Sequence, residues 1–143
     1  MTLPTGQQPA SGADLMRRFL PTSPYVQHLG IRLVDLQPDS AALALPFSEA
    51  LITVGATVHG GAIASLIDTA AMVAAWSNAE VPEKMRGVTV SLTVTYLAAA
   101  EKEDMVAVAR VLRRGRSLVY IDVDVKTASE HAVAKGLVTY KIG

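Results

Sequence analysis

The amino-acid sequence predicts an α+β fold in which a curled antiparallel β-sheet wraps around one long central helix. One apolar helix lies between two groups of strand-like segments. The segments after it follow one another through hairpin-length connections, which favour an antiparallel sheet. Because the helix is apolar on nearly all sides, the sheet that buries it must curl around it.

The first part of the chain predicts a short helix and two strands. The helix, residues 13–20, is expected to end before Pro21. Residues 30–37 and 40–47 are rich in apolar side chains and flank a Pro38–Asp39 turn. These two segments are therefore predicted to pair as neighbouring strands.

The long helix is predicted over residues 60–77. Between its second glycine and Ser77, only Ser65, Asp68 and Thr69 are polar. A helix without a broad polar face is typical of a buried element. We therefore expect it to be covered on all sides.

After "EVPEKMRG" the hydrophobic period changes to two. Residues 88–96 alternate apolar side chains with Ser and Thr, which is the pattern of a strand. Residues 104–112 and 117–126 predict a hairpin joined by "RRGR", and residues 132–142 predict a last strand, bulged at Gly136.

Composition limits the kinds of function open to this chain. It has 143 residues, 13 basic and 13 acidic side chains, and a formal net charge of zero. A chain without excess positive charge has no overall electrostatic attraction for nucleic acid or for an anionic membrane. The chain has no cysteine, which excludes thiol catalysis and thiolate metal sites.

Residues 1–12 are predicted to form a disordered lead, and residues 13–143 one domain. The N-terminus does not have the pattern of a secretory signal, so a cytoplasmic location is expected. A membrane span is not expected, because the uncharged run before Asp68 is interrupted by glycines and His59.

Asp68 has two interpretations. Buried carboxylates are often hydrogen-bonded parts of the structure. No Lys or Arg lies between Glu49 and Lys84, however, and Asp68 lies too far into the helix to cap it. A carboxylate in an apolar site without a nearby cation also suits a general base. The residues alone leave both interpretations open.

The His-Gly-Gly segment before the helix, residues 59–61, also has two interpretations. It can be a tight entry turn in which glycine supplies unusual backbone angles. Alternatively, free backbone N–H groups at the helix start can polarise a carbonyl and stabilise an oxyanion. The glycine spacing of dinucleotide and phosphate-binding loops is not present.

Helix geometry separates these two candidates within one chain. Gly60 and Asp68 are eight residues apart, which is roughly 12 Å along a helix. A base must lie within hydrogen-bond reach of the water that attacks a polarised carbonyl. Two copies with antiparallel helices would place each Asp68 opposite the Gly60 of the other copy. We therefore expect a site shared between the subunits of a homodimer.

At this point the sequence resembles a known family. "TVHGGAIASLIDTAA" is similar to the motif of hotdog-fold acyl-CoA thioesterases of the phenylacetic-acid-degradation (PaaI-like) type. "HLGIRLVDL", "GVTVSLTVTYLAAA" and "VLRRGRSLVYIDVDV" resemble further strands of that family. The resemblance implies a hotdog fold that is at least dimeric and often a dimer of dimers.

The resemblance also implies residue roles. Asp68 matches the catalytic carboxylate, which acts as general base or as nucleophile. Gly60 matches the oxyanion N–H, and Gly61 assists close packing. His59 either orients the carbonyl or stabilises the turn. Thr89 matches a hydroxyl that positions water, although it reaches a same-chain Asp68 only if the Thr face of its strand turns toward the helix.

Further candidate residues concern substrate binding. Many relatives have Asn where this chain has Thr53, a change that indicates a different acyl group. Met72 lies one turn beyond Asp68 and is a core residue, a substrate contact, or both. The one basic cluster is either a solvated hairpin tip or a contact for coenzyme A phosphates; it consists of Arg113, Arg114 and Arg116.

The predicted function is hydrolysis of an acyl-CoA or aryl-acyl-CoA thioester to the acid and free coenzyme A. It requires no metal or other cofactor, because coenzyme A is part of the substrate. Two alternatives remain on the same fold: a non-catalytic acyl-CoA binder or sensor, and an acyl-thioester hydratase or dehydratase. The latter would use His59 and Asp68 as an acid–base pair.

Overall fold

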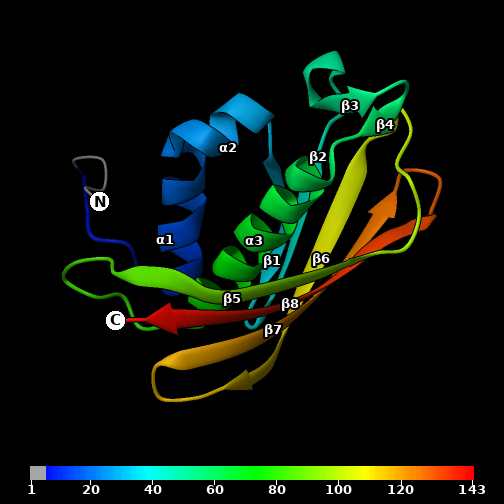
Figure 1. The fold of residues 1–143 in the computed structure, drawn as a ribbon. Coiled ribbons are helices and arrows are strands. Elements are labelled where there is room, and N and C mark those ends of the chain that lie inside the picture. The colour runs from blue at the N-terminus through cyan, green and yellow to red at the C-terminus, as the bar shows by residue number, and fades with distance from the viewer. Residues whose placement is uncertain (1–5) are drawn as a thin grey trace.

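The computed structural model describes residues 6–143 and has the predicted α+β architecture (Figure 1). In chain order the elements are α1 (Gly12–Phe19), the 3₁₀ turn η1 (Leu20–Thr22), α2 (Pro24–Leu29), β1 (Arg32–Gln37), β2 (Ser40–Leu45), the 3₁₀ turn η2 (Glu49–Leu51), β3 (Ile52–Val54), β4 (Thr57–Val58), α3 (Gly60–Ser77), β5 (Gly87–Tyr96), β6 (Met105–Arg114), β7 (Leu118–Thr127) and β8 (Ala132–Ile142).

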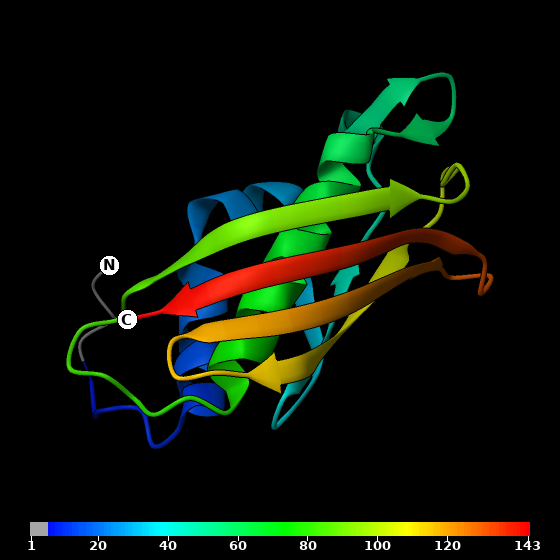
Figure 2. The ribbon, with the colours of Figure 1, turned by 60° about the horizontal axis from the view of Figure 1, so that its bottom comes forward.

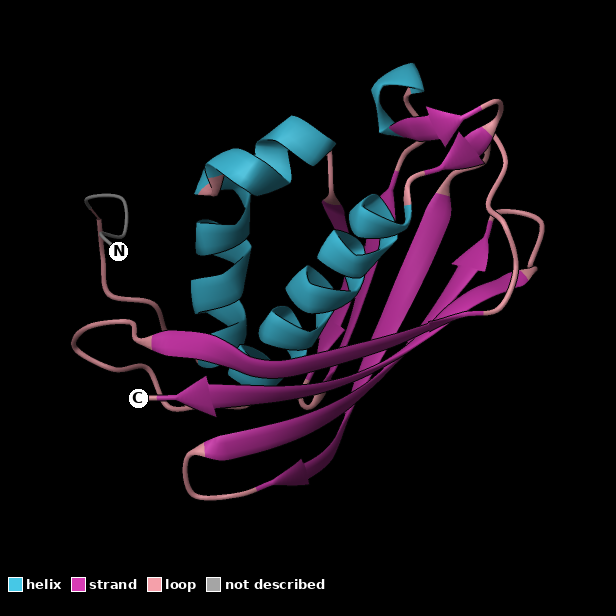
Figure 3. Ribbon diagram, in the orientation of Figure 1, coloured by secondary structure: helices cyan, strands magenta, loops and turns pink. Residues whose placement is uncertain are grey.

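Six strands form one antiparallel sheet in the order β1-β2-β6-β7-β8-β5. The sheet curls around α3, which crosses its concave face (Figures 2 and 3). β3 and β4 form a small separate hairpin beside the start of α3. The prediction of a curled sheet around one central helix is confirmed.

The core is formed where α3 packs against the sheet. The helix buries Leu66, Ile67, Val73 and Trp76 completely, and the inner faces of β2, β6, β7 and β8 supply most of the apolar side chains around it, with α1 adding Leu15 and Met16. By length and composition α3 could cross a membrane, but 61% of it is buried inside the protein. Its apolar character is therefore explained by the core.

The expectation that α3 is covered on all sides is wrong. One side of the helix is not fully buried. We call this side the open stripe; it consists of Gly61, Ala64, Ser65, Asp68, Thr69 and Met72. The spacing of three and four residues places these positions on one helix face. The sheet covers the opposite face, and the stripe itself is only partly covered, by Thr89 at Asp68 and by Tyr25 at Ser65.

The N-terminal region differs in part from its prediction. Of the predicted lead, residues 1–5 lie outside the described residues. Pro9 is buried and Ser11 caps α1 by accepting a hydrogen bond from the Asp14 N–H at 3.1 Å. Gly12 packs so closely on the end of α3 that an added Cβ would lie 1.9 Å from the Trp76 carbonyl oxygen.

The sequence analysis missed α2. Pro24 begins this helix, because proline is well suited to a first helical position, where its missing N–H leaves no helix bond unmade. The helix ends at Leu29, and its C-cap is Gly30. The φ of Gly30 is 78°, a left-handed backbone conformation that favours glycine. Tyr25 on α2 forms a 3.0 Å hydrogen bond with Ser65, which ties α2 to α3.

A β-bulge divides β5 into two parts. Thr89 pairs with Tyr140 and Ser91 pairs with Thr139, so Val90 has no partner in β8. An extra residue reverses which side chains face inward. Thr89 therefore faces α3 before the bulge, and Val94 and Tyr96 lie on the inner side after it. The uninterrupted alternation predicted for residues 88–96 is wrong at this point.

The predicted bulge at Gly136 is also wrong. Gly136 pairs regularly with Val94 and with Val123, and the irregularity in the pairing of β8 with β7 lies at Val133 instead. An added Cβ at Gly136 would lie 2.5 Å from Cγ2 of Ile67. This glycine lets α3 approach the sheet closely.

Candidate active site

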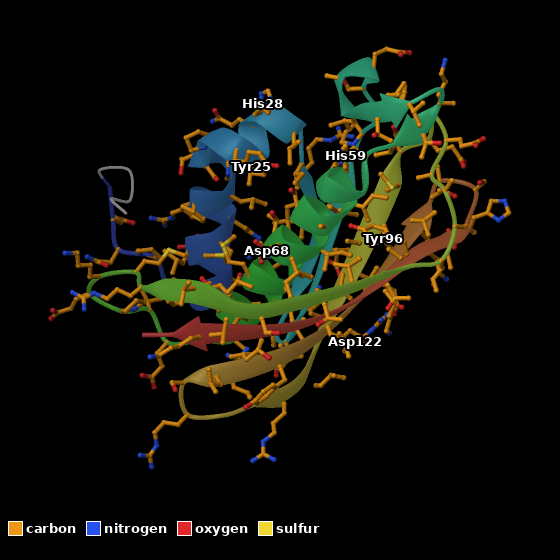
Figure 4. The ribbon with its side chains drawn as sticks, in the orientation of Figure 1. Tyr25, His28, His59, Asp68, Tyr96 and Asp122 are labelled. Atoms are coloured by element: carbon orange, nitrogen blue, oxygen red, sulfur yellow. The ribbon has the colours of Figure 1, made fainter. Side chains whose placement is uncertain are left out.

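Asp68 lies at the middle of α3 on the open stripe (Figure 4). It is half-buried, and one carboxylate oxygen, Oδ1, accepts a 2.6 Å hydrogen bond from the Thr89 hydroxyl. Within residues 6–143, no Lys, Arg or His forms an ion pair with it. The second oxygen, Oδ2, is therefore left available for chemistry.

The position of Thr89 follows from the bulge in β5. The sequence analysis left open whether Thr89 turns toward the helix of its own chain. In the structure it does, because the bulge at Val90 separates its orientation from that of the other threonines on β5. Thr93 and Thr95 lie on the outer side of the sheet, opposite Leu137 and Lys135.

His59 is the N-cap of α3. Its Nδ1 accepts a 2.7 Å hydrogen bond from the Gly61 N–H. Because Nδ1 is the acceptor, a neutral imidazole carries its proton on Nε2. The ring thus stabilises the entry turn, and Nε2–H remains as a donor.

Gly60 contributes the first N–H of α3. A first helical N–H has no partner within the helix, and none of the described residues accepts a hydrogen bond from it. The carbonyl of His59, at the other end of the same peptide unit, accepts from Ala62 N–H at 3.0 Å and Ile63 N–H at 3.4 Å. These bonds restrain the peptide unit that carries the Gly60 N–H.

Tyr96 is a residue of this site that the sequence analysis missed. Its hydroxyl donates a 2.6 Å hydrogen bond to the Gly60 carbonyl. The sequence shows Tyr96 only as the last apolar position of an alternating strand. Its contact with Gly60 depends on the bulge and on the path of β5 along α3, which the alternation does not reveal.

The structure does not bring Gly60 and Asp68 of one chain together. Both lie on one continuous helix, about two turns apart and so roughly 12 Å from each other. Figure 4 shows His59 at the start of α3 and Asp68 well along it. Within one chain, the carboxylate and the free N–H cannot act on the same carbonyl carbon.

The other predicted substrate contacts lie in different places. Met72 is half-buried on the open stripe, one turn beyond Asp68. Thr53 is exposed on β3, in the small hairpin near the start of α3. The structure therefore places Met72 beside Asp68 and Thr53 near the Gly60 end.

The basic cluster lies at the opposite end of α3 from Gly60. Arg114 donates to Oδ1 of Asp39 from two nitrogens, at 2.7 and 3.1 Å, and the Asp39 N–H bonds to Ser77 at the end of the helix. Arg114, the last residue of β6, therefore has a structural role: it holds Asp39 in the β1–β2 turn. Arg113 and Arg116 are exposed and line a hollow of about 360 Å³.

Trp76 and Tyr140 lie beneath the site and belong to the core. The Trp76 indole N–H donates to the Tyr140 hydroxyl at 3.1 Å. Burial raises the pKa of Tyr140 above its ordinary value of 10.0, the Trp76 hydrogen bond opposes this, and the charge of Asp68 adds to it. Tyr140 is therefore a neutral neighbour of the carboxylate.

Comparisons with known proteins identify the family to which the chain belongs. The family model of the thioesterase superfamily matches residues 55–134. Human acyl-coenzyme A thioesterase 13 is 30% identical over 115 residues, which cover 79% of this chain and 80% of the human protein.

Solved structures show the same fold. A thioesterase family protein from Silicibacter pomeroyi has a TM-score of 0.86 and 28% identity, over 92% of this chain and 97% of that one. The PaaI protein of the E. coli phenylacetic acid degradation operon has a TM-score of 0.83 at 17% identity, over 96% of each chain. The chain therefore belongs to the thioesterase superfamily and has its hotdog fold.

Proposed function

We propose that this protein hydrolyses an acyl-CoA or aryl-acyl-CoA thioester to the free acid and coenzyme A. The observation that carries the proposal is the pair formed by Asp68 and Gly60. One is a carboxylate held by Thr89, and the other is an N–H restrained by the turn; among residues 6–143 the first has no cation beside it and the second has no acceptor. Membership of the superfamily and the name of the human relative support a thioester substrate.

The groups divide the reaction between them. Asp68 accepts a proton from a water molecule through Oδ2, and the water oxygen attacks the thioester carbonyl carbon. The Gly60 N–H and the Nε2–H of His59, both from a second copy of the chain, face the oxyanion that forms. Collapse of this intermediate breaks the C–S bond and releases the coenzyme A thiolate, which takes up a proton.

A direct attack by Asp68 is the other form of the same reaction. Its Oδ2 would form an anhydride with the acyl group, release the thiolate and then be hydrolysed by water. Because Thr89 occupies Oδ1, both forms use the same free oxygen.

We propose that the site is completed by a second copy of the chain. The open stripe of α3 carries Asp68, and β5 is an edge strand that exposes Val88 at 58% and Val90 at 57%. An apolar edge strand favours pairing with another chain. Two helices packed antiparallel along their open stripes would bring each Asp68 to the Gly60 of its partner. A dimer of dimers remains a prediction.

The proposal extends to the substrate contacts. Gly61 and Met72 on the open stripe and Thr53 on β3 are proposed to line the acyl pocket. Arg113 and Arg116 are proposed to contact coenzyme A phosphates, while Arg114 is engaged by Asp39. Two further statements stay predictions: that the reaction needs no cofactor, and that the protein is cytoplasmic.

The test is release of free thiol from a panel of acyl-CoA substrates by wild type and Asp68→Asn. We expect the variant to lose at least about a hundredfold in rate, or about 2.7 kcal/mol of barrier stabilisation. Asp124→Asn, on the outer sheet face, serves as a control with unchanged turnover. Unchanged turnover in Asp68→Asn would refute the assigned role of Asp68.

Other outcomes separate the alternatives. Binding of acyl-CoA by wild type without thiol release would indicate a binder or sensor. Conversion of an enoyl thioester without thiol release would indicate a hydratase.

A further inference from the structure

The Tyr96 ring lies directly against the first residue of α3. An added Cβ at Gly60 would be 3.1 to 3.3 Å from three atoms of the Tyr96 side chain. Glycine at this position therefore leaves the space into which the ring fits. The Tyr96 hydroxyl then reaches the Gly60 carbonyl at 2.6 Å, although the side chain as a whole is 50% exposed.

This hydrogen bond completes the fixation of two successive peptide units. The Gly60–Gly61 unit is held at its N–H by Nδ1 of His59 and at its C=O by Tyr96. The preceding His59–Gly60 unit is held at its C=O by the helix. Gly60 is the joint between the two units, and glycine has more backbone freedom than any other residue. The two anchors at its C-terminal side therefore limit how far the free N–H can turn.

We propose that Tyr96 is a positioning residue that orients the Gly60 N–H toward the thioester oxygen. The inference rests on the proposed function and adds to it a residue that does not touch the reacting atoms. Preorganised donors stabilise an oxyanion because they need no reorientation during the reaction. Loss of the hydroxyl would leave the N–H in place and loosen its direction.

The same strand also holds the carboxylate. Thr89 and Tyr96 are seven positions apart, so a regular strand would point them to opposite faces. Because Val90 is an extra residue in the bulge, the alternation of side chains is offset by one position after it. Thr89 and Tyr96 therefore both face α3. One edge strand thus fixes Asp68 through Thr89 and the helix start through Tyr96.

The test compares two tyrosine-to-phenylalanine variants. Tyr96→Phe removes the hydrogen bond from β5 to Gly60 of α3. Tyr25→Phe removes the hydrogen bond from α2 to Ser65 of α3, and the two tyrosines are similarly exposed. We expect Tyr96→Phe to lower kcat about fivefold to tenfold with KM changed less than about twofold. Tyr25→Phe should leave kcat within about twofold of wild type.

Carbonyl ¹³C NMR of protein labelled at glycine supplies a second readout. The Gly60 resonance should move in Tyr96→Phe and stay in place in Tyr25→Phe. An equal loss of kcat in both variants would overturn the inference, as would an unshifted Gly60 resonance or a rise in KM at unchanged kcat. These results differ from failure of the proposed function, in which the wild type itself releases no thiol.

Discussion

At the residue scale, the two glycines of the His-Gly-Gly segment are required for space rather than for unusual backbone angles. Neither Gly60 nor Gly61 has a positive φ, in contrast to the turn glycines Gly30 and Gly55. An added Cβ at Gly61 would lie 2.9 Å from Nδ1 of His59, and one at Gly60 would meet Tyr96. Each glycine therefore admits one of the rings that fix the helix start.

Gly60→Pro isolates the role of one N–H group. His59 has φ of −59° and ψ of 131°, which a residue before proline readily adopts, and proline is accepted at a first helical position. We expect the variant to fold and to lose thiol release by about a hundredfold or more, as for loss of an oxyanion donor.

Gly60→Ala is the matched control for this variant. It adds a Cβ at the same place but keeps the N–H, and the exposed Tyr96 ring can move to accommodate it. Thiol release should stay within about tenfold of wild type. An active Gly60→Pro enzyme would show that this N–H does not stabilise the oxyanion.

At the element scale, the distance between α3 and the sheet depends on Gly136. The glycine lies near the middle of β8, the strand next to the edge strand β5, beneath Ile67. Neighbouring positions of β8 are regularly paired on both sides, so the strand cannot move away alone. Contact at this point sets how closely the carboxylate approaches β5.

Gly136→Ala is expected to lower the free energy of unfolding by about 1 to 3 kcal/mol, because its Cβ would overlap Cγ2 of Ile67. Urea unfolding measures the change. Gly6→Ala, where an added Cβ meets nothing within 4 Å, is the control and should be neutral. Unchanged stability in Gly136→Ala would mean that α3 and the sheet separate without cost.

At the scale of the whole molecule, the proposed site depends on two copies of the chain. Each copy supplies an Asp68 held by its own Thr89 and a Gly60 held by its own Tyr96. Their separation along one helix prevents them from serving one substrate within a chain. Each dimer would then have two equivalent sites related by symmetry.

Mixed dimers test this arrangement. Asp68→Asn and Gly60→Pro subunits carrying different tags are co-expressed, and the heterodimer is purified through both tags. One of its two sites would combine intact Asp68 and Gly60, so about half the wild-type thiol release is expected. Each homodimer of a variant serves as a control with little activity. An inactive heterodimer would place the site within one chain.

Stability at high pH is a second property of the whole molecule. Burial raises the pKa of Tyr140 in the folded protein, whereas the unfolded side chain ionises near its ordinary pKa of 10.0. Above about pH 10 the unfolded state binds fewer protons, so the free energy of unfolding falls as pH rises. The pKa of Lys135 is also raised, mainly by its hydrogen bond to Asp122, and its contribution is lost in the same direction.

Urea unfolding between pH 7 and 11 measures this decline. Tyr140→Phe should be less stable at pH 7, because the bond from Trp76 is lost, but its stability should fall less steeply above about pH 10. Tyr120→Phe, on the outer sheet face, is expected to keep the wild-type slope. An equal slope in Tyr140→Phe would show that Tyr140 does not cause the decline.

The sequence by itself determined the helix at residues 60–77, the strands after it and the family, because these depend on local periodicity and on a short motif. It also identified Asp68 as unusual, since a lone acid stands out within an apolar helix.

Only the tertiary structure decided which side chains meet. The bulge at Val90 turns Thr89 and Tyr96 toward α3, and alternation in the sequence does not show which residue is left without a partner. The open stripe exists because the sheet covers only one side of α3. Bulges and coverage arise from the pairing of segments far apart in the chain, so no local pattern records them.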